Sequence, residues 1–600
     1  MSAPVETPRD DDFVAPEELK SSFAVLRRGI RESPELRAGL GFTVVISLGV
    51  VVAHLTTPVL VQLVFDHGFD GGFRPGYVGT VCALAFGLVF LTFVSSRSAG
   101  RRLVRAAESA MMGLRVRTFA HIHRLSIAEQ SEEKRGVFVA RVTADIDAMQ
   151  QFMEWGGIAW IWAGVQVFAS LALMLVFSWQ LSLAIVALVI PLIAIVWALQ
   201  SRLSAAYDVA RTRVGEMLSE VSESVMGAAV VRAYGLDQRT FGRVRGAIDR
   251  RYRAEVVAHF RAATLFPLST VFYAISVSIV VVLGASFGPD WGLTFGRVTA
   301  FLFLTDSFLH VFTDLPEIYS ETQTAIAGWR KVLSVLDLPI DVEEPSPGVE
   351  LPAGPLSVAA RDVSFAYRDG GPVLHGVTLE VAPGEHVAIV GQTGCGKTTF
   401  VKLVSRLADP VAGSIEVGEI DVRDVSASSR RRSIRMVPQD GFLFDTTVRE
   451  NVRIGREDAT DREVETAFEE LGLVAWAVSL PNGLDTVVGE RGEALSVGER
   501  QLVALARAQV GDPGLLILDE ATSAVDPATE RRISEALRRL SEGRTTITVA
   551  HRLSTAQGAD RVLVFDAGRL VETGTHETLV EVGGTYARLY ESWLGNVRVG

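Results

Sequence analysis

Residues 391–398 read Gly-Gln-Thr-Gly-Cys-Gly-Lys-Thr, and the chain is organised around this stretch. An apolar run at 385–390 precedes it and predicts a buried strand, and the pattern at 399–404 predicts the start of a helix. Strand, glycine-rich loop and helix in this order indicate a phosphate-binding loop. Glycines leave room for backbone N–H groups to surround a phosphate, and the helix N-terminus adds positive charge. Lys397 is expected to reach the β- and γ-phosphates, and Thr398 to bind Mg²⁺.

The composition argues against a nucleic-acid partner, and none is expected. The chain has 600 residues and a formal net charge of −12, and its apolar runs are concentrated in the first half. Its two cysteines are Cys82, in an apolar run, and Cys395, in the glycine-rich loop, which excludes a disulfide framework. The first twenty residues are polar and acidic, so no cleavable signal peptide is expected.

Six apolar stretches are each near the ~20 residues needed to cross a bilayer. Their expected positions are 39–65, 77–96, 157–177, 180–200, 263–284 and 294–315. The run 171–189 shows that they are too long and too apolar for core helices of a soluble protein. Before the first span, residues 1–21 are expected to form a disordered acidic tail. Residues 22–36 are expected to form an amphipathic helix on the inner membrane surface.

The distribution of Lys and Arg predicts the orientation of the spans. The long connections 97–150 and 201–260 are basic, as is the segment before the first span. The other connections hold a single arginine, Arg74, and are 66–76, 178–179 and 285–293. Both termini and both long connections should therefore lie in the cytoplasm. We expect a multi-pass protein of the inner (plasma) membrane whose nucleotide-binding domain is cytoplasmic.

The long connections are predicted to be helical, because their apolar residues recur at helical spacing. Each is interrupted once, near 126–135 and near 235–243, where a short turn could touch another domain. A Pro-, Gly- and Glu-rich linker follows the last span, and alternating strand and helix patterns then predict an α/β domain. The expected organisation is a tail (1–21), a transmembrane domain (22–338), a linker (339–355) and a nucleotide-binding domain (356–592).

A second motif supports the phosphate-binding loop. The apolar run 515–518 predicts a buried strand, and Asp519 and Glu520 follow it directly. In a P-loop enzyme the first acid orients Mg²⁺ through water, and the second polarises the attacking water. A buried strand that meets a helix cap would give the same pattern, but the phosphate-binding loop favours the P-loop interpretation.

A third motif, Leu-Ser-Val-Gly-Glu-Arg-Gln at 495–501, stands between these two and leads into a helical run. With the phosphate-binding loop (Walker A), the acidic strand (Walker B) and six fused spans, the chain resembles a bacterial ATP-binding-cassette (ABC) half-transporter of the exporter type, similar to multidrug and lipid exporters. The resemblance covers residues 22–590 and implies a six-span helical membrane domain fused to an α/β P-loop nucleotide-binding domain.

The resemblance also implies the roles of further motifs. Tyr367 stands where the family stacks a ring on adenine, and Gln439 matches the Q-loop glutamine, which touches Mg²⁺ and the attacking water. His551 matches the switch histidine, Gly489-Glu490-Arg491-Gly492 the X-loop, and Ser523-Ala524-Val525-Asp526 the D-loop. The implied nucleotide-binding residues are Tyr367, Gly391, Thr393, Gly394, Cys395, Gly396, Lys397, Thr398, Thr399, Ser496, Gly498 and Asp526. The implied catalytic residues are Glu520, His551 and Gln439, and the implied Mg²⁺ ligands are Thr398, Gln439 and Asp519.

In this family two cassettes pair head to tail, and each ATP lies between one Walker A loop and the signature of the other chain. One cassette and six spans therefore imply half a transporter. The usual signature is Leu-Ser-Gly-Gly-Gln, whereas Val497 and Glu499 replace a glycine and the glutamine here. A β-branched residue resists left-handed φ, and a carboxylate near a phosphate is unfavourable unless it points away. Both side chains could instead face solvent. The altered signature favours a heterodimer, and a homodimer remains possible.

The substrate is poorly specified by the sequence. Asp306, His310 and Asp314 are four residues apart in the sixth span and share one helical face. Such acids indicate either contact with a substrate or proton, or helix–helix hydrogen bonding, and both remain open. The resemblance implies ATP-driven export of a small hydrophobic or amphipathic solute, such as a drug, a lipid or a peptide-like molecule, by alternating access. An importer built on the exporter fold and an ATP-gated channel are the alternatives.

Overall fold

The computed structural model describes residues 21–37, 40–69, 72–126, 132–367, 371–439, 441–519, 526–550 and 553–597. The chain divides into two compact units, and each is described by itself. The first unit comprises residues 1–122 and 136–337, and the second comprises 123–135 and 338–600. The expected acidic tail, 1–21, lies outside the described residues except for Ser21.

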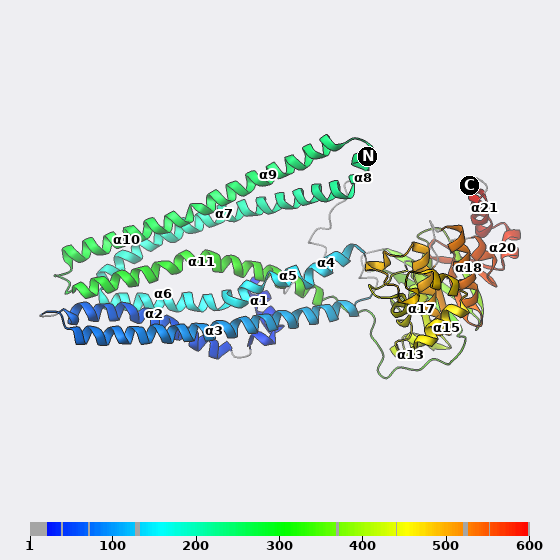
Figure 1. The fold of residues 1–600 in the computed structure, drawn as a ribbon, viewed down its shortest axis with the longest axis horizontal. Helices are drawn as coiled ribbons and strands as arrows, with labels where there is room; N and C mark the ends of the chain where they lie inside the picture. Colours follow the sequence, from blue (N-terminus) through cyan, green and yellow to red (C-terminus); the bar gives the residue numbers. More distant parts are fainter. Residues whose placement is uncertain are drawn as a thin grey trace. The chain divides into compact units, whose positions relative to one another are not determined.

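The first unit is built of long helices that run side by side (Figure 1). Its helices are α1 (Ser22–Arg31), η2 (Pro34–Arg37), α2 (Leu40–Gly68), α3 (Pro75–Arg124), α4 (Glu132–Val142), α5 (Ala144–Asp147), η3 (Phe152–Gly156), α6 (Gly157–Phe177), α7 (Trp179–Met226), α8 (Ala228–Ala233), α9 (Asp237–Ala263), α10 (Leu265–Phe287) and α11 (Phe295–Leu336).

Six stretches of helix in the described chain are long and apolar enough to cross a membrane, which confirms the predicted spans. Several run far beyond the apolar stretch that predicts them. The helix α3 has 50 residues, and α7 has 48, so the basic connections continue the spans as helix. Proline is tolerated inside α2, α7 and α11, where neighbouring groups of a membrane bundle can satisfy the freed carbonyls.

The second long connection is interrupted earlier than the sequence pattern indicates. The helix α7 ends at Met226 with Gly227 as its C-cap, α8 follows, and a turn at 234–236 precedes α9. Gly235 has φ +63°, a left-handed conformation that glycine adopts without a Cβ penalty. The expected interruption near 235–243 therefore lies mostly within α9. Most of the corresponding turn near 126–135 lies outside the described residues.

The amphipathic helix α1 packs its apolar side against protein. Val25 is fully buried, and Gly29 lies against the indole of Trp329 in α11. Arg28 extends this contact with a bidentate ion pair to Asp337, and its Nη1 lies 2.8 Å from Oδ2. Only Phe23 leaves most of its apolar surface, 74%, exposed. The expected membrane-surface helix is thus docked on the end of α11.

This docking makes a testable prediction at Gly29. A Cβ placed there would lie 2.5 Å from Cδ2 of Trp329, whose side chain is 1% exposed and cannot yield. We expect Gly29→Ala to destabilise the membrane unit by about 1–3 kcal/mol through overpacking. Gly242→Ala in α9 is the matched control, because nothing lies within 4 Å of its Cβ position. Thermal unfolding of the two purified variants in detergent measures the difference, and equal melting temperatures would contradict the prediction.

The second unit contains two sheets and the helices that cover them. Its strands are β1 (Val358–Ala366), β2 (Pro372–Val381), β3 (His386–Gly391), β4 (Ala412–Val417), β5 (Ile420–Asp421), β6 (Ile434–Val437), β7 (Leu515–Asp519), β8 (Thr545–Val549), β9 (Arg561–Asp566) and β10 (Arg569–Gly574). The smaller sheet is antiparallel, in the order β2-β1-β4-β5. The larger sheet, β10-β9-β3-β8-β7-β6, is parallel except for β10.

Helices of the second unit cover the larger sheet and form a separate helical part. They are α12 (Lys397–Val404), α13 (Ala427–Ser433), α14 (Val448–Arg453), α15 (Asp461–Glu470), α16 (Val474–Ser479), η4 (Gly483–Asp485), η5 (Glu490–Gly492), α17 (Val497–Gly511), α18 (Pro527–Ser541), α19 (Leu553–Gln557), α20 (His576–Val582) and α21 (Thr585–Val597). One apolar core lies around β3 and α12, and another lies among α14–α18. These two cores carry different parts of the candidate site.

The segment expected to be a linker lies along the second unit. Arg406 is buried and donates to the carbonyl of Glu343 at 2.6 Å. Glu344 accepts two hydrogen bonds from Arg430, and the Arg430 guanidinium holds the pKa of Glu344 below its usual value. Val349 pairs with Val425 in an isolated parallel bridge. Residues 343–349 are therefore anchored rather than free, despite their Pro- and Glu-rich sequence.

Candidate nucleotide-binding site

The glycine-rich loop joins the buried strand β3 to helix α12, as the sequence predicts. Gly391 has φ +152°, and a Cβ there would lie 2.2 Å from the carbonyl oxygen of Phe565. Gly396 has φ +99° immediately before α12, and a Cβ there would meet Leu374 at 2.7 Å. Both positions therefore require glycine. The loop is held tightly against β2 and β9, which fixes where its N–H groups point.

Lys397 lies inside this loop. Its Nζ donates to the carbonyl oxygens of Gly391 at 2.8 Å and Gln392 at 2.9 Å, and the side chain is only 5% exposed. Burial raises the pKa of the neighbouring Cys395 thiol, so the sulfur stays neutral beside the ammonium group. The loop thus holds one buried positive charge at its centre, at the N-terminus of α12.

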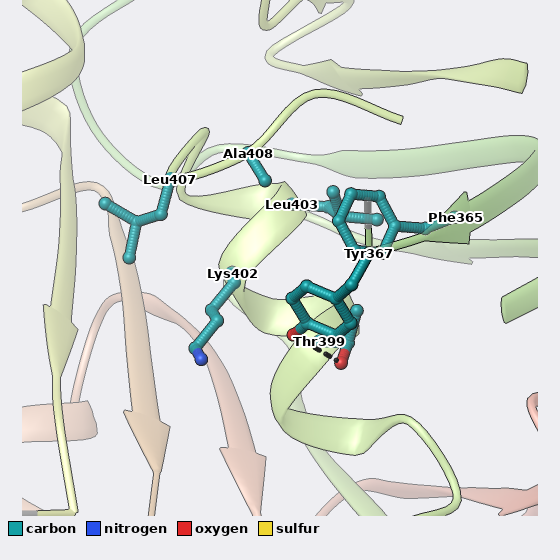
Figure 2. A pocket seen from close by; sticks show the side chains of 7 residues that line it. All are labelled: Phe365, Tyr367, Thr399, Lys402, Leu403, Leu407 and Ala408. Atoms are coloured by element: carbon teal, nitrogen blue, oxygen red, sulfur yellow. Dashed lines mark hydrogen bonds between the residues drawn. The ribbon is translucent and has the colours of Figure 1, made fainter. Parts of the chain in front are cut away.

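Tyr367 lies beside the first turn of α12. Its hydroxyl is 3.1 Å from Oγ1 of Thr399, and its ring meets the edge of Phe365 at a centroid distance of 5.0 Å. Figure 2 shows these side chains around a small pocket with Leu403, Leu407 and Ala408, while the Lys402 ammonium points away from the rings. The aromatic residue expected at the adenine is therefore held next to the phosphate-binding loop.

The acidic strand ends at the same edge of the sheet as the phosphate-binding loop. Val549 of β8 pairs with Ile389 of β3 on one side and with Asp519 of β7 on the other. Since neighbouring strands are ~4.8 Å apart, Asp519 and the start of the loop are ~10 Å apart across one strand. Asp519 is 6% exposed. Glu520 directly follows β7, and His551 stands two residues beyond the end of β8; both lie outside the described residues.

Gln439 lies two residues beyond β6, the parallel neighbour of β7, and its side chain is exposed. The chain after it is held by two residues that the sequence analysis did not single out. The side chain of Asn451 is completely buried, and it bonds both the N–H and the carbonyl of Phe444 at 2.9 Å. Arg507 donates to the carbonyl of Phe442 at 3.2 Å. Arg507 stands in the largely apolar run of α17, which was an available signal, whereas the polar sequence of α14 does not single out Asn451.

The signature lies in the helical part of the unit rather than on the core that carries the phosphate-binding loop. Ser496 is the N-cap of α17, and Val497 is its first residue. Val497 does not have the left-handed φ that the sequence analysis considered, and its side chain is 50% exposed. Glu499 is half-buried, and both of its oxygens accept hydrogen bonds: Oε2 from the Ser496 backbone N–H at 2.9 Å, and Oε1 from the Trp476 indole N–H at 3.1 Å.

Two further expected motifs lie near this helix or after it. In the X-loop, Arg491 has φ +55°, and Arg500 of α17 donates to the carbonyl of Gly492 at 3.4 Å. Asp526 is the N-cap of α18, where Oδ1 accepts the N–H groups of Ala528 and Thr529. Hydrogen bonding by Thr529, through its side chain first and then its backbone N–H, holds the pKa of Asp526 below its usual value. The rest of the D-loop, 523–525, lies outside the described residues.

The face of α11 that carries Asp306, His310 and Asp314 is open in the described chain. Nδ1 of His310 lies 3.2 Å from Oδ2 of Asp314, within the same helix, and the two side chains are 69% and 45% exposed. Asp306 is also exposed. In the described chain, the side-chain hydrogen bond between His310 and Asp314 lies within α11 and does not join this helix to another.

Known proteins share both units. The family profile of the ABC transporter transmembrane region matches residues 40–310, and the profile described as ABC transporter matches residues 374–523. ABC transporter ATP-binding protein YfiC of Bacillus subtilis is 31% identical over 92% of each chain. The chain belongs to the ABC transporter family. The six-helix membrane unit and the α/β nucleotide-binding unit of this ABC transporter are those predicted from its sequence.

Relatives with more specific names are also similar to this ABC transporter. The ATP-dependent lipid A-core flippase of Desulfotalea psychrophila is 33% identical, over 81% of this chain and 85% of the flippase. The fatty acid ABC transporter ATP-binding/permease protein of Mycobacterium tuberculosis is 34% identical, over 84% of this chain and 80% of that protein. A solved bacterial Atm1-family ABC exporter with ATP bound superposes with a TM-score of 0.75 at 27% identity, covering 93% of this chain and 98% of the exporter.

Proposed function

We propose that the chain is one half of a dimeric ABC exporter that uses ATP hydrolysis to move a hydrophobic or amphipathic solute across the inner membrane. The observation that carries the proposal is the arrangement around β8. The phosphate-binding loop and Asp519 flank this strand at one edge of the sheet, in a chain that also has six membrane-crossing helices. Similarity to flippases, a fatty acid transporter and an exporter supports export.

The residues at this edge suit a nucleotide bound with Mg²⁺. The hydroxyl of Thr398, the carboxylate of Asp519 and the amide oxygen of Gln439 are oxygen donors of the kind that Mg²⁺ prefers. Within the described ranges no cluster of three or more His, Cys, Asp or Glu could hold a metal by itself. The ion would therefore be held largely by the phosphates, and it would neutralise charge on them during transfer.

Each residue has a proposed task in hydrolysis. The Lys397 ammonium would give up its hydrogen bonds to the loop carbonyls and donate to phosphate oxygens instead. Tyr367 would stack on adenine. Glu520 would polarise the attacking water, which Gln439 and His551 would orient. The signature residues Ser496 and Gly498 would complete the site of the other half-transporter, because they stand apart from this chain's own loop. Closure of the pair on ATP, followed by release after hydrolysis, would drive alternating access.

The second half-transporter is either another copy of this chain or a different protein. The departures at Val497 and Glu499 favour a different protein. ATP hydrolysis by the purified single chain distinguishes the two assemblies: robust turnover indicates a homodimer, and near-absence of turnover that a second half-transporter restores indicates a heterodimer. The exposed acids Asp306 and Asp314 on α11 favour a solute with a cationic or polar head, since charge inside a membrane domain normally faces a cavity or a partner.

Transport direction tests the proposal. Inside-out vesicles are prepared with this chain alone and with this chain plus the second half-transporter. In such vesicles the nucleotide-binding unit faces the added ATP. We expect ATP and Mg²⁺ together to drive uptake of a fluorescent phospholipid or amphipathic dye, and vesicles without ATP to show none. Uptake only into right-side-out vesicles would indicate an importer. A flux that needs ATP binding but not hydrolysis would indicate a channel, and either result contradicts export.

A further inference from the structure

The first turn of α17 is closed by a reciprocal pair of hydrogen bonds. Oγ of Ser496 accepts the backbone N–H of Glu499 at 3.3 Å, and Oε2 of Glu499 accepts the backbone N–H of Ser496 at 2.9 Å. This is a capping box, which fixes the N-terminus of a helix by satisfying two donors that the helix itself cannot. The acid that departs from the usual signature is therefore part of the helix cap.

Glu499 makes a second contact that a glutamine cannot make at the same time. Its other oxygen, Oε1, accepts the indole N–H of Trp476 in α16 at 3.1 Å, and Trp476 is 4% exposed. A carboxylate offers two acceptor oxygens, whereas a glutamine offers one oxygen and one NH₂ group. With glutamine at 499, either the Ser496 N–H or the Trp476 N–H would face another donor. The buried indole therefore matches the acid.

The same contacts direct the carboxylate charge into the helical part of the unit. Burial by itself raises the pKa of Glu499, but the bonds from the Ser496 backbone and the Trp476 indole outweigh it, so the pKa lies below its usual value. Glu499 is thus ionised with both oxygens engaged. The hydroxyl of Ser496 and the N–H of Gly498, expected to face the phosphate, are not needed to satisfy the carboxylate.

We propose that Trp476 and Glu499 are a matched pair of positioning residues that holds the altered signature in its ATP-accepting form. The acid caps α17 with one oxygen and anchors that cap to α16 with the other. The departure from Leu-Ser-Gly-Gly-Gln is then compensated within this chain, and restoring the usual glutamine alone weakens the signature. The inference rests on the proposed function, since the signature acts in a closed pair of cassettes, and it applies to a homodimer and a heterodimer alike.

Hydrogen exchange on the purified full chain tests the pair without needing turnover or a partner. We expect Glu499→Gln to speed exchange of the backbone amides at 496 and 499 roughly 3- to 10-fold, as for the loss of one ordinary hydrogen bond. Trp476→Phe removes the second donor, so the double variant Trp476→Phe/Glu499→Gln should return to within about twofold of the original rate. Such non-additivity of the two substitutions would show that the side chains at 476 and 499 interact directly.

A matched control exists in the same unit. Glu463 closes a capping box with Thr460 at the start of α15, but no indole donates to it in the described chain. Glu463→Gln should leave exchange at 496 and 499 unchanged. If Glu499→Gln prevents folding, exchange will be faster throughout the second unit, and the double variant then decides. Recovery of the original exchange rates in the double variant supports the proposed pair, and no recovery overturns it.

Steady-state hydrolysis separates positioning from chemistry in whichever assembly turns over ATP. Glu499→Gln should raise KM for ATP roughly 3- to 10-fold with kcat within about twofold, and Trp476→Phe should restore KM in that background. The proposal is overturned if Glu499→Gln leaves both amides and KM unchanged, or if the two substitutions act additively. Failure of the unsubstituted protein to hydrolyse ATP in any assembly would count against the proposed function instead, while the exchange result would still decide on the pair.

Discussion

Glu520→Gln is expected to lower ATP hydrolysis by on the order of 10²–10⁴-fold while ATP binding survives. Glu520 immediately follows Asp519, the last residue of the buried strand β7, at the sheet edge that carries the phosphate-binding loop. A carboxylate there can polarise the attacking water, whereas an amide of the same shape cannot. Steady-state phosphate release and equilibrium binding of a fluorescent ATP analogue measure the two quantities separately, in the assembly that gives turnover.

Glu542→Gln is the control for this substitution, because Glu542 lies at the exposed C-terminal end of α18, where its side chain pairs with Arg538. It should change hydrolysis by less than about twofold. Turnover of Glu520→Gln close to that of the unsubstituted protein would refute the proposed role of Glu520. A parallel loss of ATP binding would show instead that Glu520 supports the fold of the site.

Lys397→Ala should weaken ATP binding about 10- to 100-fold, the effect of losing charged hydrogen bonds to phosphate, and should reduce turnover at low ATP at least as much. The Lys397 ammonium is buried and held by the carbonyls of Gly391 and Gln392, so it is already positioned at the centre of the loop. Its loss also leaves two inward-facing carbonyls without their donor. Nucleotide binding and thermal unfolding, measured on the same preparation, distinguish these two consequences.

Lys402→Ala is the matched control, since Lys402 lies on the same helix but directs its ammonium away from Tyr367 (Figure 2). We expect its nucleotide affinity to stay within about threefold of the original value. If Lys397→Ala bound ATP as tightly as Lys402→Ala does, the glycine-rich loop would not be the phosphate site. The contrast with Glu520→Gln is equally informative, because that variant should bind ATP but not hydrolyse it at the normal rate.

Local patterns predicted the fold well because the determinants lie within short stretches. Apolar length predicts the membrane-crossing helices, and the spacing around 391–398 predicts β3, the loop and α12. That Asp519 lies close to the phosphate-binding loop was also predictable, because both motifs stand at the ends of strands in a parallel sheet. The positions of strand ends follow from the general geometry of such sheets rather than from particular side chains.

Contacts between distant residues were beyond those patterns. The sequence shows Glu499 as a departure from the usual signature, but not that Trp476, which precedes it by 23 residues, supplies its second donor. Asn451 likewise reads as a polar residue in a short helix until its bonds to Phe444 are seen. The helix α1 was predicted from its own amphipathic pattern, which carries no information about Trp329. In these three cases the sequence does not reveal which distant residue a side chain contacts.

The ion pair between Arg28 and Asp337 joins residues separated by 309 positions, and this separation has a consequence for synthesis of the protein. At about 5–20 residues per second, Asp337 emerges from the ribosome roughly 15–60 s after Arg28. Until Trp329 has emerged, α1 lacks the indole that lies against Gly29 and shares an apolar core with Val25. An amphipathic helix in that position is stabilised by the headgroup region of the bilayer. We therefore expect the amphipathic pattern of residues 22–31 to serve the nascent chain at the membrane surface first, and the completed bundle only after its last helix has been inserted.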